Sequence, residues 1–358
     1  MKNATRHVLM FLALSASSLL AKDPKQIFSE WDRDKDGKLT LEELPRNARP
    51  NFQRVDTNQD GSISLAEHEN FLKRPRQPRK TRPLPEGIKP LLNLSYADTD
   101  NPRQTLDLFL PEKRKLGGPL PIIVYIHGGG WKNGRKESGI GKLGPYLKTG
   151  SFAAASINYR LSGEAIWPAQ IHDCKAAIRW LKGNAEKYGF DAERMAVWGN
   201  SAGGHLVAML GVSGEVKALE GKLGKHMDQD SRVSCVVDFC GPTHLLSMGK
   251  FPSNIDHDAA NSPESQLIGG ALQENKKAAN KASPMTYVTK DDAPTIIVHG
   301  TEDPLVPFNQ AKIFHEALTE AGVPNTFLPM KGMGHGLSGP VVDESVRKFL
   351  EAHLLGKK

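Results

Sequence analysis

Ser201 lies in a setting that favours nucleophilic chemistry. It is the central residue of Gly199-Asn200-Ser201-Ala202-Gly203, which directly follows the short apolar run Met195–Trp198. An apolar strand that runs into Gly-x-Ser-x-Gly and then into a helix holds the serine hydroxyl on a sharp turn above a sheet. The two glycines allow that turn because they carry no side chain. The pattern predicts that Ser201 is a catalytic nucleophile.

A second group of residues suited to catalysis lies upstream. The apolar run Ile122–Ile126 ends in His127-Gly128-Gly129-Gly130-Trp131. Consecutive glycines can direct several backbone N–H groups at one point, where they stabilise the negative charge of a tetrahedral acyl-transfer intermediate. We expect Gly129, Gly130 and Ala202 to be the donors of such an oxyanion hole. His127 is expected to anchor the glycine loop, and Trp131 either borders a pocket or packs in the core.

Two further motifs have the spacing of a calcium-binding loop. The first is Asp32-Arg33-Asp34-Lys35-Asp36-Gly37 with Glu43, and the second is Asp56-Thr57-Asn58-Gln59-Asp60-Gly61 with Glu67. Each places oxygen-bearing side chains at loop positions 1, 3 and 5, glycine at 6 and glutamate at 12. Residues 22–72 therefore resemble an EF-hand pair, and two such matches in tandem are not accidental.

The EF-hand resemblance implies a Ca²⁺ site in each loop. The predicted ligands are Asp32, Asp34, Asp36, Lys38 and Glu43 in the first loop, and Asp56, Asn58, Asp60, Ser62 and Glu67 in the second. Lys38 and Ser62 occupy position 7, where the backbone carbonyl coordinates the ion. Leu39 and Ile63 at position 8 suit apolar pairing between the loops. Since extracellular sites of this type bind calcium weakly, a structural role is expected.

The chain from about residue 91 onward must position the serine and the glycine loop, and it alternates between two kinds of pattern. Short apolar runs predict buried strands, and apolar residues at three- and four-residue spacing predict amphipathic helices. The predicted strands are 106–110, 122–126, 152–157, 195–198, 235–239 and 295–298, and the predicted helices are 169–188, 308–321 and 341–354. Such alternation predicts a mostly parallel sheet covered on both faces. Residues 243–285 fit no clear period and are a candidate mobile cap.

The N-terminal residues predict export. Lys2, Arg6 and His7 precede the apolar stretch Val8–Ala21, so residues 1–21 are predicted to be a signal peptide cleaved after Ala21. That stretch is too short to predict a membrane span. Residues 73–90 are rich in Lys, Arg and Pro and predict an extended linker, with contact to an anionic polysaccharide or envelope as the alternative. The mature chain is expected in the periplasm or outside the cell.

Composition excludes several classes of protein. The chain has 358 residues, with 47 Lys+Arg against 40 Asp+Glu and 39% hydrophobic residues, which is typical of a soluble globular protein. Much of the net charge of +7 lies in the segment 73–90, which argues against nucleic-acid binding. No integral membrane association is expected. Cys174, Cys235 and Cys240 are interpreted as buried thiols, with a bridge from Cys174 to one of the others as the alternative.

Residues 91–358 resemble the α/β-hydrolase superfamily, and within it the HGGG-type carboxylesterases of the acetylxylan and feruloyl esterase-like group. The resemblance rests on the glycine loop, on Gly199–Leu206, and on the blocks 158–161, 167–173 and 238–243. Cys240 departs from the group, in which an aromatic residue is more typical at this position. The resemblance implies the α/β-hydrolase fold, a mostly parallel sheet flanked by helices, here with a small N-terminal α-helical EF-hand domain.

The order of catalytic residues in that family, serine then acid then histidine, implies the other members of a triad. Asp303 matches the acid in the turn His299–Pro307, with Glu302 as its rival, and His335 matches the histidine. His335 would take the proton of Ser201 and return it to the leaving alkoxide, while Asp303 orients the imidazole. This chemistry needs no metal or cofactor. The remaining histidines are expected to be structural or exposed.

The expected function is that of a secreted serine carboxylesterase, with acetyl or feruloyl esters of polysaccharides as the suggested substrates. Two alternatives stay open. The same triad would serve an arylformamidase-like or peptidase-like amide hydrolase. A hydrolase fold without activity would leave a non-catalytic, calcium-dependent binding protein, because a fold by itself does not determine a function.

Overall fold

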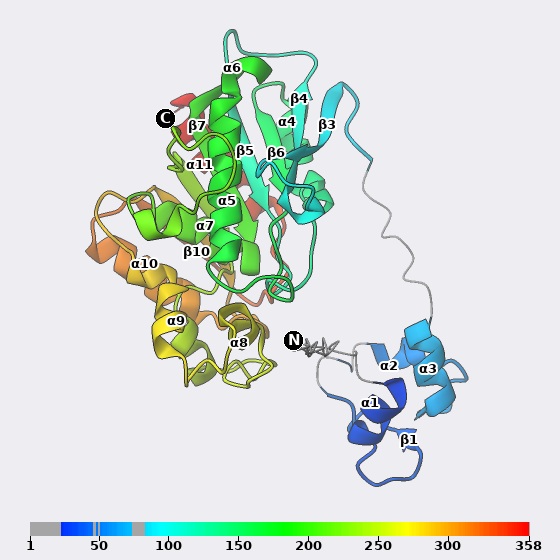
Figure 1. The fold of residues 1–358 in the computed structure, drawn as a ribbon. Coiled ribbons are helices and arrows are strands. Elements are labelled where there is room, and N and C mark those ends of the chain that lie inside the picture. Colours follow the sequence, from blue (N-terminus) through cyan, green and yellow to red (C-terminus); the bar gives the residue numbers. More distant parts are fainter. Residues whose placement is uncertain (1–22, 46–47, 49–50, 74–82, 358) are drawn as a thin grey trace, which may run out of the picture. The chain divides into compact units, whose positions relative to one another are not determined.

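The computed structural model describes residues 23–45, 48, 51–73 and 83–357, and the chain forms two compact units that divide between residues 79 and 80. The first unit holds both calcium-loop motifs, and the second holds the Ser201 motif (Figure 1). The predicted signal peptide and residues 74–82 of the predicted linker lie outside the described residues. Among the described residues, no helix combines the length and the apolar character that a membrane crossing requires.

The first unit holds two loops, each preceded by a short helix, and the second loop runs into a third helix. Its elements are α1 (Pro24–Trp31), β1 (Lys38–Leu39), α2 (Phe52–Val55), β2 (Ile63–Ser64) and α3 (Leu65–Lys73). The Asp23 carboxylate accepts the Lys25 N–H at 3.0 Å, which caps α1. Strands β1 and β2 pair antiparallel with Leu39 opposite Ile63, and both side chains are buried with Phe28. The predicted apolar pairing between the loops is therefore confirmed.

The second unit is built on an eight-stranded sheet in the order β10-β9-β8-β7-β5-β6-β4-β3. The strands are β3 (Ile88–Ser95), β4 (Thr105–Pro111), β5 (Leu120–Ile126), β6 (Ala153–Ile157), β7 (Phe190–Asn200), β8 (Cys235–Phe239), β9 (Thr295–Gly300) and β10 (Asn325–Met330). Neighbours from β10 to β6 run parallel, whereas β4 runs antiparallel to β6 and β3. The predicted mostly parallel sheet is confirmed.

The six strands predicted from apolar runs are all present, whereas apolar runs did not predict the two edge strands, β3 and β10. Both are only partly buried, so neither shows an unbroken apolar run. Strand β3 also begins at Ile88, inside the segment that the sequence pattern assigned to the linker. Pairing with β4, rather than hydrophobic pattern, makes this segment a strand.

Helices cover both faces of the sheet. They are α4 (Ile140–Lys148), α5 (Ala169–Gly183), α6 (Ala185–Tyr188), α7 (Ala202–Val212), α8 (Pro263–Ile268), α9 (Lys276–Lys281), α10 (Asn309–Glu320) and α11 (Pro340–Leu355), with 3₁₀ turns at Pro102–Gln104, Lys136–Ser138, Lys217–Leu219, Leu245–Lys250 and Pro284–Thr286. Helices α5 and α7 share one core cluster with alternate residues of β5. Helices α4 and α11 pack with the intervening β5 residues on the opposite face. Side chains that alternate along a strand account for this division.

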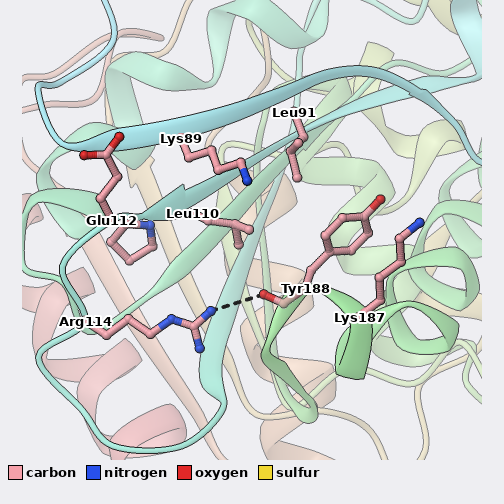
Figure 2. A pocket seen from close by; sticks show the side chains of 8 residues that line it. Lys89, Leu91, Leu110, Glu112, Arg114, Lys187 and Tyr188 are labelled. Carbon is pink, nitrogen blue, oxygen red and sulfur yellow. Dashed lines mark hydrogen bonds between the residues drawn. The ribbon is translucent and has the colours of Figure 1, made fainter.

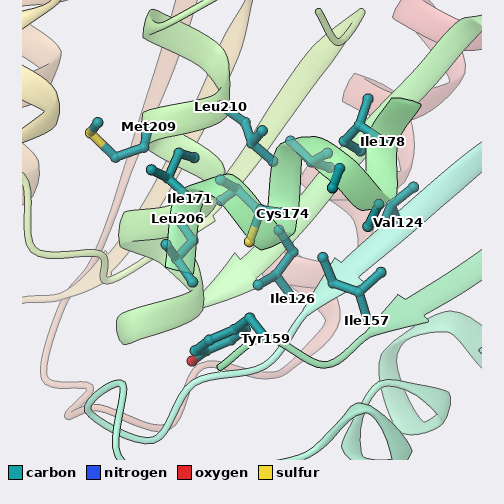
Figure 3. Close-up of a cluster of buried hydrophobic side chains, with 14 of the residues drawn as sticks. Val124, Ile126, Ile157, Tyr159, Ile171, Cys174, Ile178, Leu206, Met209 and Leu210 are labelled. Carbon is teal, nitrogen blue, oxygen red and sulfur yellow. The ribbon is translucent and has the colours of Figure 1, made fainter. Parts of the chain in front are cut away.

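The core beneath α5 and α7 contains one of the three cysteines. Figure 3 shows Cys174 of α5 among Ile171, Leu206, Ile126 and Ile157. All three cysteines are buried free thiols, so the interpretation as buried thiols is confirmed and the alternative of a Cys174 bridge is wrong.

Residues 243–285, which showed no period in the sequence, fold into short helices. Helices α8 and α9 lie in this segment (yellow in Figure 1), and each has only six residues. Leu245, Met248 and Leu267 belong to the same core cluster as α5 and α7. Helices this short cover too few turns to reveal a 3.6-residue repeat. The segment is packed onto the sheet unit through these apolar side chains.

Buried polar contacts tie the loop after β5 to the sheet. The Lys136 Nζ lies 2.7 Å from the Asp107 carboxylate and 2.8 Å from Asn93 Oδ1, and the Lys136 N–H donates to Asn158 Oδ1 at 2.8 Å. The Lys136 and Asp107 side chains are both buried. A buried ion pair of this kind needs these additional partners to offset its loss of hydration. The contacts fix the chain that leaves the glycine loop.

Candidate active site

The parallel register brings the ends of the central strands to one edge of the sheet. Gly199 lies beside Ile126, and Asn200 lies beside Phe239. The residues that come next in each chain segment, His127, Ser201 and Cys240, therefore emerge together. Strands β9 and β10 run in the same direction on the other side of β8, so the loops that carry Asp303 and His335 follow at the same edge.

Ser201 occupies the turn between β7 and α7 with φ 56° and ψ −125°. Its N–H donates to the Phe239 carbonyl at 2.8 Å, and its carbonyl accepts the His205 N–H at 3.0 Å. A positive φ is unfavourable for a residue with a side chain, and such strain is found where the surroundings enforce it. This is the backbone conformation expected of a nucleophile on a strand-to-helix turn.

The two glycines of the motif are required by close packing. A Cβ atom on Gly199 would lie 2.2 Å from the Gly203 carbonyl oxygen, and one on Gly203 would lie 2.1 Å from the Ile126 carbonyl oxygen. Neither position can therefore hold a side chain without movement of the backbone. The prediction that these glycines permit a tight turn is confirmed.

The glycine loop borders the serine. A Cβ on Gly128 would lie 3.3 Å from the Ser201 Cβ, and Gly129 and Gly130 both have positive φ. Within the described part of the chain, the N–H groups of Gly129, Gly130 and Ala202 have no protein acceptor. The first N–H groups of a helix are left free by its geometry, which explains the case of Ala202. Free donors beside a nucleophile are what an oxyanion hole requires.

His127 anchors this loop, as the sequence predicts. Its ring stacks on Tyr159 with 4.3 Å between centroids, and its Nδ1 donates to the Gly128 carbonyl at 2.8 Å. The Tyr159 hydroxyl donates to the His127 carbonyl at 3.0 Å. Burial lowers the pKa of His127 to about 4, so the ring is neutral near pH 7.

Trp131 packs in the core rather than at a pocket rim. Its side chain is buried, and its indole N–H donates to His205 Nδ1 at 3.1 Å. His205 Nε2 donates in turn to the Ala282 carbonyl, at 2.6 Å. Burial lowers the pKa of His205 to about 4. The expected local packing role of His205 is confirmed, and these contacts connect the glycine loop to the segment 243–285.

Asp303 and His335 are in direct contact. The His335 Nδ1 lies 2.7 Å from Asp303 Oδ2, and Asp303 Oδ1 accepts the N–H groups of Leu305 and Val306 at 2.8 and 3.0 Å. Asp303 is buried, whereas Glu302 is exposed. Of the two candidate acids, Asp303 is the one that the fold places against the histidine. The described residues contain no hydrogen bond between the Ser201 hydroxyl and the His335 ring, a contact that is often long before substrate binds.

A second histidine, His299, also contacts the acid. Its Nε2 lies 3.2 Å from Asp303 Oδ2 and 3.0 Å from the Val306 carbonyl. Burial alone would raise the pKa of Asp303, but the hydrogen bonds with His299 and His335 outweigh it and hold that pKa well below its ordinary value. From the sequence alone, His299 was expected to have only a structural or exposed role. The sequence feature that could have indicated this contact is the spacing of four residues between His299 and Asp303.

Asp238 of β8 lies behind the Ser201 turn. It is fully buried, and its Oδ1 accepts the Gly241 N–H at 2.9 Å while its Oδ2 has no partner. Burial raises the pKa of Asp238 to about 6, although the nearby His299 and the Gly241 N–H oppose the change. A carboxyl group is therefore close to its titration range beneath this site.

The first calcium loop gathers its carboxylates. Donor oxygens of Asp32, Asp34 and Asp36 lie within 4.8 Å of one another. Glu43 reaches back across the loop, since its Oε1 accepts the Arg33 N–H at 3.0 Å. Asp32 Oδ1 is buried without a hydrogen-bond partner. An unpaired buried carboxylate oxygen is costly without a cation, so the residues fit Ca²⁺. The Lys38 side chain is exposed, in keeping with a contribution from its backbone alone.

The second loop has the same form. Gly61 N–H donates to Asp56 Oδ2 at 3.0 Å, and Asp60 N–H donates to Asn58 Oδ1 at 2.9 Å. Glu67 accepts the N–H groups of Thr57 and Ser64, both within 2.9 Å. Burial opposes ionisation of Glu67, but the hydrogen bonds from Ser64 and Thr57 lower its pKa to about 2. The Ser62 hydroxyl bonds to Asp60, which leaves the Ser62 carbonyl as the predicted ligand.

A separate surface pocket contains none of the predicted site residues. It has a volume of about 440 Å³ and is lined by Lys89, Leu91, Leu110, Pro111, Glu112, Arg114, Lys187 and Tyr188 (Figure 2). Arg114 spans it and donates to the carbonyls of Tyr188 and Gly189. The guanidinium is therefore engaged in joining the loop after β4 to the end of α6.

Comparisons with known proteins agree with this architecture. Residues 106–318 match the family BD-FAE, and residues 25–46 and 52–72 match the EF hand. The chain is 29% identical over 252 residues to Esterase LipC of Mycobacterium tuberculosis, an alignment that covers 66% of this chain and 58% of the relative. It spans about half the length of the curated relatives it matches.

Solved structures give the same result. A truncated carbohydrate esterase from gut microbiota has a TM-score of 0.69 and 34% identity, covering 75% of this chain and 96% of that one. A bifunctional GH43-CE protein of Bacteroides eggerthii has a TM-score of 0.68 and 33% identity, covering 74% and 35%. With the family match extending over more than half of the sequence, the chain belongs to the BD-FAE family of α/β hydrolases and carries an N-terminal EF-hand pair.

Proposed function

We propose that this protein is a serine carboxylesterase whose catalytic triad is Ser201, His335 and Asp303. The observation that carries the proposal is the convergence at one sheet edge of a serine at positive φ, free backbone donors, and a histidine bonded to a buried carboxylate. The named esterases among the relatives support it. No observation favours cleavage of amide bonds over cleavage of esters, and none favours an inactive binding protein.

In the proposed mechanism each of these residues has a role. His335 takes the proton of the Ser201 hydroxyl as Oγ attacks the ester carbonyl carbon, and the carbonyl oxygen becomes an oxyanion. The free N–H groups of Gly129, Gly130 and Ala202 donate to that oxyanion, each worth about 3 kcal/mol in such sites. His335 then protonates the leaving alkoxide, and water releases the acyl group by the same route. Because its pKa is low, Asp303 stays ionised and keeps the proton of His335 on Nδ1.

Acetyl or feruloyl esters of polysaccharides are the proposed substrates. Support comes from the 34% identical relative, which is named a carbohydrate esterase. We also propose that the chain is exported to the periplasm or beyond, since residues 1–21 have the composition of a signal peptide. A polymeric substrate outside the cytoplasm requires an exported enzyme.

Each EF-hand loop is proposed to hold one Ca²⁺ ion with a structural role. The carboxylates of the first loop converge, and those of the second are preordered by backbone N–H donors. A bound ion would neutralise these clustered charges and hold the paired loops together. The triad residues all lie in the other unit, and the proposed mechanism has no step that uses the ion.

Replacing the nucleophile tests the proposed chemistry. Ser201→Ala is expected to lower kcat for p-nitrophenyl acetate by about 10⁴-fold or more, because the hydroxyl is the attacking group. The exposed Ser138 provides the control, since Ser138→Ala should leave the rate unchanged. Equal rates in wild type and Ser201→Ala would contradict the proposal, and faster release from p-nitroacetanilide than from the ester would favour an amide hydrolase.

His299 is expected to position Asp303. Loss of a hydrogen bond to a charged group costs about 1.5 to 3 kcal/mol, so His299→Leu should lower kcat roughly 10- to 100-fold with little change in KM. His299→Gln keeps a donor near Asp303 and should recover part of that loss. Steady-state kinetics checks this, with the free energy of unfolding measured in parallel. Identical kcat values in the two variants would assign His299 a purely structural role.

The substrate proposal predicts release of acetate from acetylated xylan or of ferulate from feruloylated arabinoxylan. The release should be absent in Ser201→Ala and is measured by chromatography. A chain that cleaves p-nitrophenyl acetate but frees neither acid from any decorated polysaccharide would keep the triad proposal and remove the polysaccharide.

Calcium titration tests the loops. Calorimetry on the metal-free chain is expected to find two sites, with Kd values on the order of 10⁻⁴ to 10⁻³ M for extracellular modules. Glu67→Gln removes the bidentate ligand and should abolish one site. Glu69 pairs with Lys73 outside the loop, so Glu69→Gln should retain both. Absence of binding at millimolar calcium would refute the assignment.

A further inference from the structure

A cysteine lies against the proposed triad. Donor atoms of Cys240, Asp303 and His335 lie within 4.8 Å of one another. Cys240 immediately follows β8, has φ 45° and is almost fully buried. Its Sγ contacts the His335 carbonyl oxygen at 3.9 Å, and its N–H donates to the Val298 carbonyl at 2.9 Å. The backbone therefore holds the thiol in place beneath the acid and the base.

These three donors form a mixed sulfur, nitrogen and oxygen set. Thiolate, imidazole and carboxylate together are ligands that suit Zn²⁺ and softer divalent cations. Bond lengths of about 2.0 to 2.3 Å place zinc ligands roughly 3.5 Å apart. His335 Nδ1 and Asp303 Oδ2, at 2.7 Å, would separate slightly on binding, and a pair of donors at the 4.8 Å limit would approach by about 1 Å. The His335 side chain is 22% exposed and lies in the loop Gly332–Gly336, so it has access to solvent.

We propose that Cys240, Asp303 and His335 form an inhibitory site for a thiophilic divalent cation, with Zn²⁺ as the probe. The proposal rests on the triad proposed above, because inhibition follows from occupying its base and its acid. Water completes the coordination on the exposed side of His335. The site is distinct from the EF-hand loops, whose side-chain donors are all oxygen atoms.

Coordination removes the general base whichever ring nitrogen binds. On binding, the Cys240 thiol loses its proton to solvent and the thiolate ligates the ion. Coordination through Nδ1 moves the ring proton to Nε2, which then cannot accept the Ser201 proton. Coordination through Nε2 occupies that lone pair directly. Asp303 ligates the ion in either case and no longer orients the ring, so hydrolysis stops until a chelator removes the metal.

Hard cations are not expected at this site. Ca²⁺ and Mg²⁺ require several oxygen ligands, and only Asp303 supplies one among the three residues. The other two cysteines lack the necessary neighbours. Cys174 packs among apolar side chains beneath α5, and Cys235 lies in the apolar cluster on the opposite face of the sheet. They provide matched controls that remove a buried thiol elsewhere.

The first experiment measures hydrolysis of p-nitrophenyl acetate by the full chain against Zn²⁺, with calcium present to fill the EF-hand loops. Each variant's rate is expressed relative to its own metal-free rate. Cys240→Ala and Cys240→Ser are expected to raise the Zn²⁺ concentration for half-inhibition at least tenfold. Cys174→Ala and Cys235→Ala should leave it unchanged, and EDTA should restore activity. The proposal is overturned if all four variants are inhibited equally, or if Zn²⁺ does not inhibit the wild type.

A spectroscopic measurement separates this inference from the proposed esterase function. Co²⁺ added to the Ser201→Ala variant should give the near-ultraviolet absorption of a cobalt–thiolate bond. This measurement does not depend on enzymatic activity. The band should be absent in the double variant with Cys240→Ser, whose fold is checked by circular dichroism. If the band is present but the wild type shows no esterase activity, the metal site is supported and the proposed function is refuted. If the wild type shows activity that depends on Ser201, but the band is absent and the Cys240 variants respond to Zn²⁺ as the wild type does, the metal site alone is refuted.

Discussion

The close approach of α7 to the ends of β5 and β7 is the contact on which the site depends. It brings backbone to backbone at Gly199 and Gly203, where a single added carbon would overlap a carbonyl oxygen. Only at this separation does the helix begin beside the glycine loop, so that the Ala202 N–H and the loop amides border one serine. The strained φ of Ser201 follows from the same packing, because the chain must reverse between a strand and a helix within one residue.

The sequence predicted those parts of the fold and site that depend on local pattern. Buried strands showed apolar runs, and each calcium loop is contained in twelve residues, so its ligand set could be predicted without tertiary structure. Strands β3 and β10 are partly exposed edge strands that pairing rather than hydrophobic pattern defines. Helices α8 and α9 were missed because each spans fewer than two turns.

Contacts between distant segments were the other part that the sequence left open. The pairing of Asp303 with His335 was expected only through family resemblance, and the structure places the two rings of His299 and His335 around the same carboxylate oxygen. The nearness of Cys240 to them depends on the register of β8 and β9, which no periodicity reveals. Asp303 thereby accepts four contacts, two on each oxygen, which matches the accepting capacity of a carboxylate and holds it in a single orientation.

Asp238 and Asp303 make the folded state respond to acid in opposite ways. The pKa of Asp303 is depressed, so its contribution to stability is present above its unfolded value of 3.8 and is lost as the pH falls below it. The pKa of Asp238 is raised to about 6, so burial of its ionised form costs stability at neutral pH, and that cost is relieved as the pH falls from about 6 toward 3.8. These two carboxyl groups together favour a mildly acidic range, in which Asp303 is still charged while Asp238, behind the Ser201 turn, is neutral.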